Sequence, residues 1–174
     1  MKKVFIDGKD GTTGLKIFKR FENRNDIELL LIDSDKRKDA EERARLINES
    51  DITFLCLPDA ASIEAVSLVE NSNTKIIDTS TAHRTLSDWA YGFAELSREH
   101  REKIESSNRI AVPGCYASGF NSIVYPLVHN GFIDKDYDIV CYALSGYTGA
   151  GKKGIAQYED LSLIHISEPT RLGM

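Results

Sequence analysis

The stretch Lys3-Val-Phe-Ile-Asp-Gly-Lys-Asp-Gly-Thr-Thr-Gly14 decides the fold class. A short apolar run ends at Asp7, and glycines follow at a G-x-x-G-x-x-G spacing before an apolar pattern of helical period begins. Glycines after a strand let the backbone turn sharply, and the N-terminus of the next helix presents free N–H groups to a pyrophosphate. The spacing departs from the usual G-x-G-x-x-G fingerprint, so a glycine-rich turn without a ligand is the alternative. The cofactor-binding residues predicted here are Gly8, Gly11, Thr12, Thr13 and Gly14.

Apolar runs and helical patterns alternate along the chain as far as residue 112. The runs cover residues 3–7, 27–33, 52–57, 75–77 and 109–112, and the helical patterns cover 15–23, 38–49, 60–69 and 97–106. Continuous apolar runs are typical of strands buried on both faces, and their alternation with helices indicates βαβ units. The sequence therefore predicts an α/β protein with a Rossmann-like parallel-sheet domain over residues 1–114.

The pattern changes after Gly114. A long helix is expected at 116–130, an alternating strand at 137–144 and a Gly- and Lys-rich loop at 145–154, which together indicate the start of an α+β catalytic domain over 115–160. Residues 161–174 resemble the translation of a sequencing-library adapter, so we expect a non-native tail there and assign no role to His165.

Composition excludes several classes of function. The 174 residues carry a net charge of −5, which gives no general attraction to nucleic acid or to an anionic membrane. No apolar run approaches the ~20 residues of a membrane span, and the N-terminus meets Asp7 and Gly8 before a signal-peptide core can form. The three cysteines show no C-x-x-C spacing, which argues against disulfides and structural zinc, so no metal is expected. We expect a cytoplasmic protein.

The end of the second apolar run gives a mixed indication of the cofactor. An acidic residue at this place often holds the ribose hydroxyl of NAD, and basic residues often hold the 2′-phosphate of NADP. The chain reads Asp33-Ser-Asp-Lys-Arg-Lys38, so Asp33 suits NAD, whereas Ser34, Lys36 and Arg37 suit NADP. A solvated charged loop is the third interpretation.

Cys115 is the candidate nucleophile. It stands in Pro113-Gly-Cys-Tyr116, between a strand and a long helix, and a helix N-terminus stabilises a thiolate. Cys56 and Cys141 lie inside predicted strands and read as small core residues.

Five motifs, in order, resemble the N-acetyl-γ-glutamyl-phosphate reductase family, the shorter of its two sequence types. They are Gly8–Gly14, Asp78–Arg84, Tyr91–Leu96, Pro113–Tyr116 and Ser145–Lys153, and the resemblance runs from Lys3 to about Asp160. It implies an NADP-dependent enzyme of arginine biosynthesis in which the Cys115 thiolate attacks an acyl phosphate, phosphate leaves, and NADPH reduces the thioester to an aldehyde. It also implies a homo-oligomer and a cofactor contact at Ser80.

The resemblance leaves several roles open. His83 and Arg84 read as part of a cofactor or substrate loop or as a structural turn. Ser145, Gly146 and Lys152 are expected near the substrate, with a flexible basic loop as the alternative.

The catalytic histidine of the family lies beyond the natural part of this chain, so the 174-residue fragment is expected to be inactive. Another semialdehyde dehydrogenase, and a non-catalytic nucleotide-binding module, are the rival functions.

Overall fold

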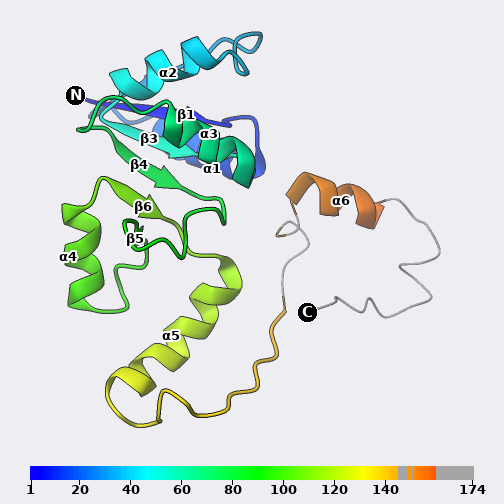
Figure 1. Ribbon diagram of the computed structural model, residues 1–174. Coiled ribbons are helices and arrows are strands. Elements are labelled where there is room, and N and C mark those ends of the chain that lie inside the picture. Colours follow the sequence, from blue (N-terminus) through cyan, green and yellow to red (C-terminus); the bar gives the residue numbers. More distant parts are fainter. Residues whose placement is uncertain (145–148, 150, 160–174) are drawn as a thin grey trace. The chain divides into compact units, whose positions relative to one another are not determined.

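The computed structural model describes residues 1–144, 149 and 151–159 (Figure 1). The chain divides into two compact units, Met1–Cys141 and Tyr142–Met174. In the second unit, the described part is mainly helix α6 (Gly151–Glu159), in a region where the sequence predicted a loop as far as residue 154.

A six-stranded sheet forms the centre of the first unit. Its strand order is β2-β1-β3-β4-β6-β5, and all neighbouring strands in it are parallel. The strands are β1 (Lys2–Asp7), β2 (Ile27–Leu30), β3 (Ile52–Leu55), β4 (Lys75–Asp78), β5 (Ala90–Tyr91) and β6 (Arg109–Ala111). The predicted α/β, Rossmann-like fold is therefore confirmed. The two-residue edge strand β5 was not anticipated.

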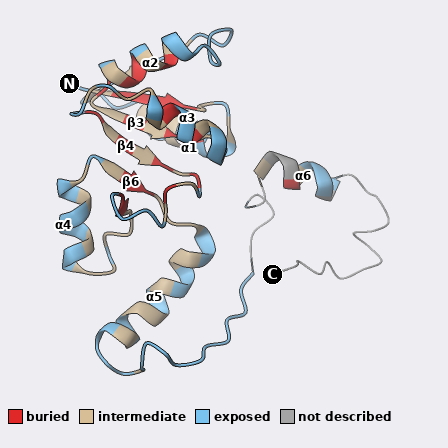
Figure 2. Ribbon diagram, viewed as in Figure 1, coloured by how far each residue is buried: buried red, intermediate tan, exposed pale blue. Residues whose placement is uncertain are grey.

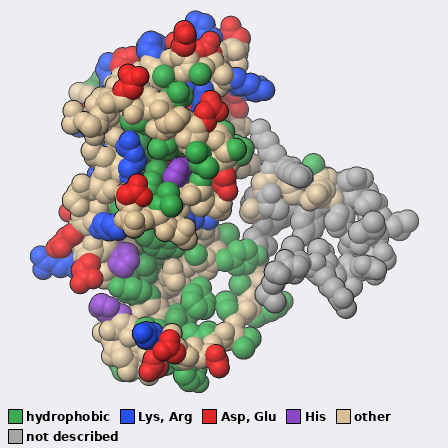
Figure 3. All heavy atoms as spheres, in the orientation of Figure 1, with side chains coloured by type: hydrophobic (Ala, Val, Ile, Leu, Met, Phe, Trp, Pro, Cys, Tyr) green, Lys and Arg blue, Asp and Glu red, His purple; other side chains and the backbone are tan. Residues whose placement is uncertain are grey.

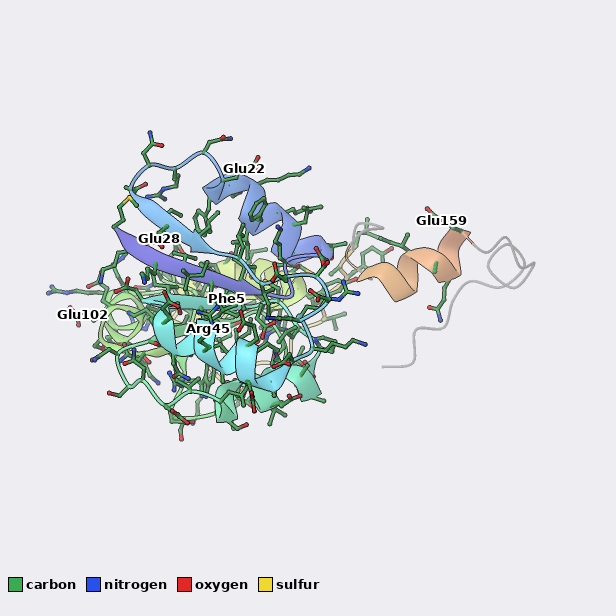
Figure 4. The ribbon with its side chains drawn as sticks, turned by 90° about the horizontal axis from the view of Figure 1, so that it is seen from above. Phe5, Glu22, Glu28, Arg45, Glu102 and Glu159 are labelled. Atoms are coloured by element: carbon green, nitrogen blue, oxygen red, sulfur yellow. The ribbon has the colours of Figure 1, made fainter. Side chains whose placement is uncertain are left out.

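Five helices accompany the sheet in the described part of this unit. They are α1 (Thr12–Phe21), α2 (Ala40–Glu49), α3 (Asp59–Ser67), α4 (Arg98–Ser106) and α5 (Cys115–His129). Helices α1 and α2 lie on opposite faces of the sheet (Figure 4). This follows from the strand order, because a right-handed crossover from β1 to β2 runs in the opposite direction to the crossover from β2 to β3. Helix α2 begins where the Asp39 carboxylate accepts a hydrogen bond from Glu42 N–H at 2.9 Å.

The core lies mainly between the sheet and the helices α2 and α3, which cover one of its faces (Figure 2). Phe5 on β1 packs with Leu46 and Ile47 of α2, and Leu55 and Ala65 extend the same cluster. On the opposite face, the rings of Phe21 (α1) and Phe54 (β3) lie 5.7 Å apart. Strand β3 alternates half-buried and buried residues, as expected where successive side chains point to opposite faces.

Residues 137–144 do not form the strand that their alternating pattern predicted. They form no strand in the described part of the chain, and Val140 is 99% exposed. A strand needs a neighbour for its backbone hydrogen bonds, and no described segment pairs with this one.

Helix α5 also has no fully buried apolar side chain among the described residues. No residue of α5 is buried, and Figure 3 shows hydrophobic side chains gathered in the region that α5 occupies in Figure 1. The exposed set includes Tyr116, Phe120, Ile123 and Leu127. Among the described residues, no helix has the length and apolar character needed to cross a membrane.

Candidate functional site

A pocket opens at the carboxyl ends of β1, β2 and β3. Its volume is about 390 Å³. From β1 the chain crosses to β2 on one side, and from β2 it crosses back to β3 on the other side of β1. This reversal is the topological switch point, where open α/β sheets bind ligands. The lining residues are Asp7, Gly8, Lys9, Asp10, Gly11, Ile32, Ser34, Arg37, Lys38, Cys56, Leu57 and Pro58.

The glycine loop is shaped by close backbone contacts. Gly8 has φ +85°, and a Cβ atom there would lie 2.3 Å from the Cys56 carbonyl oxygen. A Cβ atom at Gly14 would lie 2.3 Å from the Gly8 carbonyl oxygen. Both positions therefore require glycine, because the neighbouring atoms belong to the backbone.

The same loop provides no side chain that caps the N-terminus of α1. Gly11 caps α1 without a side-chain hydrogen bond, and the first turn has no acidic residue. The N–H groups of Thr12, Thr13 and Gly14 belong to the first turn, where a helix has no internal acceptors. The N–H groups of the first turn, the positive end of the helix dipole and the glycines at 8, 11 and 14 fit the pyrophosphate of a dinucleotide.

Only some of the predicted 2′-phosphate residues lie at the pocket. Ser34 and Arg37 line it, whereas Lys36 and Asp33 do not. Arg37 Nη1 donates to Asp10 Oδ2 at 3.0 Å. Lys9, Asp10, Lys38 and the segment after β3 were not singled out from the sequence, although the parallel order of the predicted strands would bring their carboxyl ends to one edge.

Asp7, the residue before Gly8, anchors the start of the glycine loop to the core. Its carboxylate is buried and accepts a hydrogen bond from Arg43 Nε of α2 at 3.0 Å, and Arg43 Nη1 also donates to Glu64 at 3.1 Å. Burial raises the pKa of Asp7 above its usual range, and the nearby Arg43 charge opposes that rise. Arg43 Nη2 is buried without a hydrogen-bond partner among the described residues.

The second part of the site lies around the carboxyl end of β4. The fully buried Asp78 carboxylate accepts hydrogen bonds from Ser62 Oγ at 3.0 Å, from Ser80 Oγ at 2.6 Å and from Ser80 N–H at 3.0 Å. Its Oδ2 also lies 2.6 Å from His83 Nδ1. The His83 ring stacks on Trp89 with the centroids 4.1 Å apart. Ser80 and His83 are therefore both engaged in holding the loop after β4.

Cys115 is the first residue of α5, directly after the strand β6 and the turn 112–114. Its side chain is exposed, and Gly114 caps the helix without a side-chain hydrogen bond. Because β4 and β6 are adjacent and parallel, the turn before Cys115 and the loop after β4 leave the same edge of the sheet. Ser145 and Gly146 lie outside the described residues, as does the side chain of Lys152.

The three cysteines differ in environment. Cys56 is partly buried, and burial raises the pKa of its thiol to about 11. Cys115 and Cys141 are both exposed, but only Cys115 begins a helix.

We expect iodoacetamide to modify Cys115 faster than Cys141 and much faster than Cys56 at pH 7.5. Relative to an ordinary thiol pKa of 9.0, a value of about 11 reduces the reactive thiolate of Cys56 roughly 100-fold, and burial hinders access further. Mass spectrometry of a time course gives the three rates, and Cys115→Ser identifies the fast site. Equal rates at Cys115 and Cys141 would contradict an activated thiol.

Replacing Arg43 with methionine should destabilise the protein by about 3–5 kcal/mol at pH 7, because it leaves the Asp7 carboxylate buried without its cation. The loss should be smaller near pH 4. A carboxyl group whose pKa is higher in the folded than in the unfolded protein stabilises the fold fully below the unfolded pKa. That stabilisation is lost as the pH rises through the folded pKa.

Urea unfolding at the two pH values measures the effect. Arg45→Met is the matched control on the same helix, because Arg45 pairs with Glu42 and Glu49 at the exposed surface, and its loss should cost at most about 1 kcal/mol (Figure 4). An equal loss for Arg43→Met at both pH values would refute the role given to Asp7.

Comparison with known proteins agrees with this geometry. Residues 36–104 match the family described as semialdehyde dehydrogenase, NAD binding domain, and residues 115–166 match semialdehyde dehydrogenase, dimerisation domain. The chain is similar to the N-acetyl-γ-glutamyl-phosphate reductase of Trichormus variabilis, with 51% identity over 90% of this chain and 49% of the relative. The enzyme of the same name from Brucella anthropi is 52% identical over 92% of this chain and 52% of the relative.

Solved structures show the same fold. Aspartate semialdehyde dehydrogenase from Francisella tularensis matches with a TM-score of 0.65 at 16% identity, covering 98% of this chain and 52% of that one. Aspartate semialdehyde dehydrogenase II from Vibrio cholerae matches with a TM-score of 0.62 at 14% identity, covering 100% and 56%. The chain spans about half the length of the curated relatives it matches. Two successive domain matches and relatives about half identical over nine-tenths of this sequence lead to one conclusion: the chain belongs to the semialdehyde dehydrogenase family.

Proposed function

We propose that this chain supplies the nucleotide site and the cysteine nucleophile for the NADPH-dependent reduction of N-acetyl-γ-glutamyl phosphate. The observation that carries the proposal is the position of Cys115, an exposed thiol at the start of α5 on the sheet edge that also bears the glycine loop. The names of relatives about 50% identical supply the substrate and the reaction.

In the proposed reaction, the Cys115 thiolate attacks the acyl carbon, and the carbon–oxygen bond to phosphate breaks. Inorganic phosphate leaves and a thioester forms. When bound, the reduced nicotinamide supplies a hydride. The thioester is thereby converted to N-acetylglutamate 5-semialdehyde, and Cys115 is released. Cys115 is the first residue of α5, where the first N–H groups of the helix and the positive end of its dipole attract negative charge.

The reduction also calls for a group that donates a proton to the developing alkoxide, and the three histidines among the described residues are poorly placed for it. His83 is buried, with Nδ1 held by Asp78 and its ring against Trp89. His100 and His129 both contact the Tyr125 ring. The family resemblance implies a catalytic histidine beyond the natural part of this chain, and we assign the proton transfer to no described side chain.

The cofactor part of the proposal favours NADPH. Arg37 and Ser34 line the pocket where the second strand ends, and Lys38 adds a second positive charge there. A guanidinium matches a phosphate in both charge and geometry. A homo-oligomer and a cytoplasmic location are parts of the same proposal, and the description of the domain matched by residues 115–166 supports the former.

Two rivals remain. Reduction of another acyl phosphate, such as aspartyl phosphate, uses the same cysteine chemistry. A nucleotide-binding module without catalysis requires no reactive thiol at Cys115.

A chimera tests the function directly. Residues 1–159 of this chain would be joined to the second half of the Trichormus variabilis relative, which is 51% identical over the matched part. We expect phosphate-dependent reduction of NADP⁺ by N-acetylglutamate semialdehyde, the reverse reaction, with activity lost in Cys115→Ser and kept in Cys141→Ser. A preference for aspartate semialdehyde would support the first rival, and cofactor binding with no turnover of either aldehyde would support the second.

Arg37→Gln should weaken NADPH binding to this chain about 10- to 100-fold and leave NADH binding nearly unchanged, because a hydrogen bond to a charged group contributes about 1.5–3 kcal/mol. Fluorescence titration with each nucleotide measures the affinities. Lys36→Gln is the matched control, since Lys36 does not line the pocket. A wild-type preference for NADH would contradict the role proposed for Arg37 and Ser34 at the 2′-phosphate.

A further inference from the structure

Arg84 joins two backbone segments at the carboxyl edge of the sheet. Its Nε donates to the Val112 carbonyl oxygen at 2.9 Å, and its Nη2 donates to the Thr79 carbonyl oxygen at 3.1 Å. Val112 follows β6 and Thr79 follows β4, and these strands are adjacent, with Asp78 opposite Ala111. One guanidinium therefore holds together the two segments where they leave the sheet.

The same guanidinium lies against the turn that precedes the nucleophile. A Cβ atom built at Gly114 would lie 2.9 Å from Arg84 Nη1. Gly114 is the cap residue of α5, and its carbonyl oxygen accepts hydrogen bonds from Ser118 N–H at 2.8 Å and Ser118 Oγ at 2.9 Å. The Arg84 guanidinium therefore occupies the space that a side chain at Gly114, the cap residue of α5, would need, one position before Cys115.

The loop that carries Arg84 is itself fixed to the core. Asp78 engages Ser80 and the neighbouring His83, and His83 stacks on Trp89, which is buried. Ala82 N–H donates to Ser80 Oγ at 3.2 Å. A flexible loop could not position the Val112–Gly114 turn, whereas this one is tied to a fully buried carboxylate.

We propose that Arg84 is a positioning residue for Cys115, which acts by clamping the Val112–Gly114 turn to Thr79. The catalytic meaning of this position rests on the proposed function, whereas the clamp is a property of the chain itself. A planar guanidinium can donate to the carbonyl groups of both segments and at the same time lie against Gly114, and a lysine ammonium lacks that fork.

The test measures the ratio of iodoacetamide modification rates at Cys115 and Cys141, with Cys141 as the internal reference. Arg84→Met should lower this ratio about fivefold, because a loosened turn no longer fixes the first N–H groups of α5 around the thiolate. Arg84→Lys should recover less than half of the loss. The matched control is Arg109→Met, because Arg109 also donates to two carbonyl oxygens, those of Thr74 and Asn108, at the opposite end of β6. Its ratio should equal that of the wild type.

A double-mutant cycle separates positioning from general loss of stability. Gly114→Ala should also lower the ratio, since its Cβ displaces the guanidinium, and it should have a smaller additional effect when Arg84 is already methionine. Additive effects, full recovery in Arg84→Lys, or an unchanged ratio in folded Arg84→Met would overturn the clamp. Circular dichroism of each variant establishes folding.

The outcome is distinct from that of the proposed function, because alkylation requires no substrate. In the chimera, the clamp predicts that Arg84→Met lowers kcat more than it changes KM. A chimera without reductase activity, together with a lowered alkylation ratio, would refute the function and leave the clamp standing.

Discussion

Two carboxylates buried at the carboxyl edge of the sheet constrain everything around the site. The strand register places Asp7 and Asp78 on either side of Leu55, so both point toward the face covered by α2 and α3. A buried carboxylate without partners costs several kcal/mol, and the fold must therefore bring donors to each one. Arg43 of α2 reaches Asp7, and Ser62 of α3 reaches Asp78 together with Ser80 and His83. Each carboxylate ties one loop to the core.

The two loops are the two halves of the candidate site. Asp7 ends β1 and fixes the origin of the glycine loop, while the close approach of Gly8 to the Cys56 carbonyl sets the floor of the pocket. Asp78 ends β4 and fixes the loop that carries Arg84, which contacts the turn before Cys115. A parallel sheet brings both to one edge, because all its strands end there. The nucleotide pocket and the nucleophile thus share one sheet as their frame.

The fold could be predicted from the sequence because short local patterns mark most of its strands and helices. Apolar runs alternating with helical periods identified every strand of the six-stranded sheet except β5, whose two residues, Ala90 and Tyr91, are too few to show a period. The partners of the buried carboxylates could not be predicted, since Arg43 is 36 residues from Asp7 and their contact depends on the three-dimensional packing of α2. The segment 137–144 shows the opposite case, because its alternating pattern is genuine but a strand forms only against a neighbour.

The way Cys115 is held explains how an exposed residue can serve precise chemistry. A reacting atom must be held close to its productive geometry, and errors near 1 Å can cost about 100-fold in rate. An exposed thiol has few side-chain contacts to provide that accuracy, so it must come from the backbone that carries it. Here the backbone is fixed from both sides: Val112 N–H donates to the Asp78 carbonyl oxygen at 2.8 Å, and the Val112 carbonyl oxygen accepts from Arg84. The side chain stays open to a substrate, while β4, β6 and the loop after β4 set the position of its Cα atom.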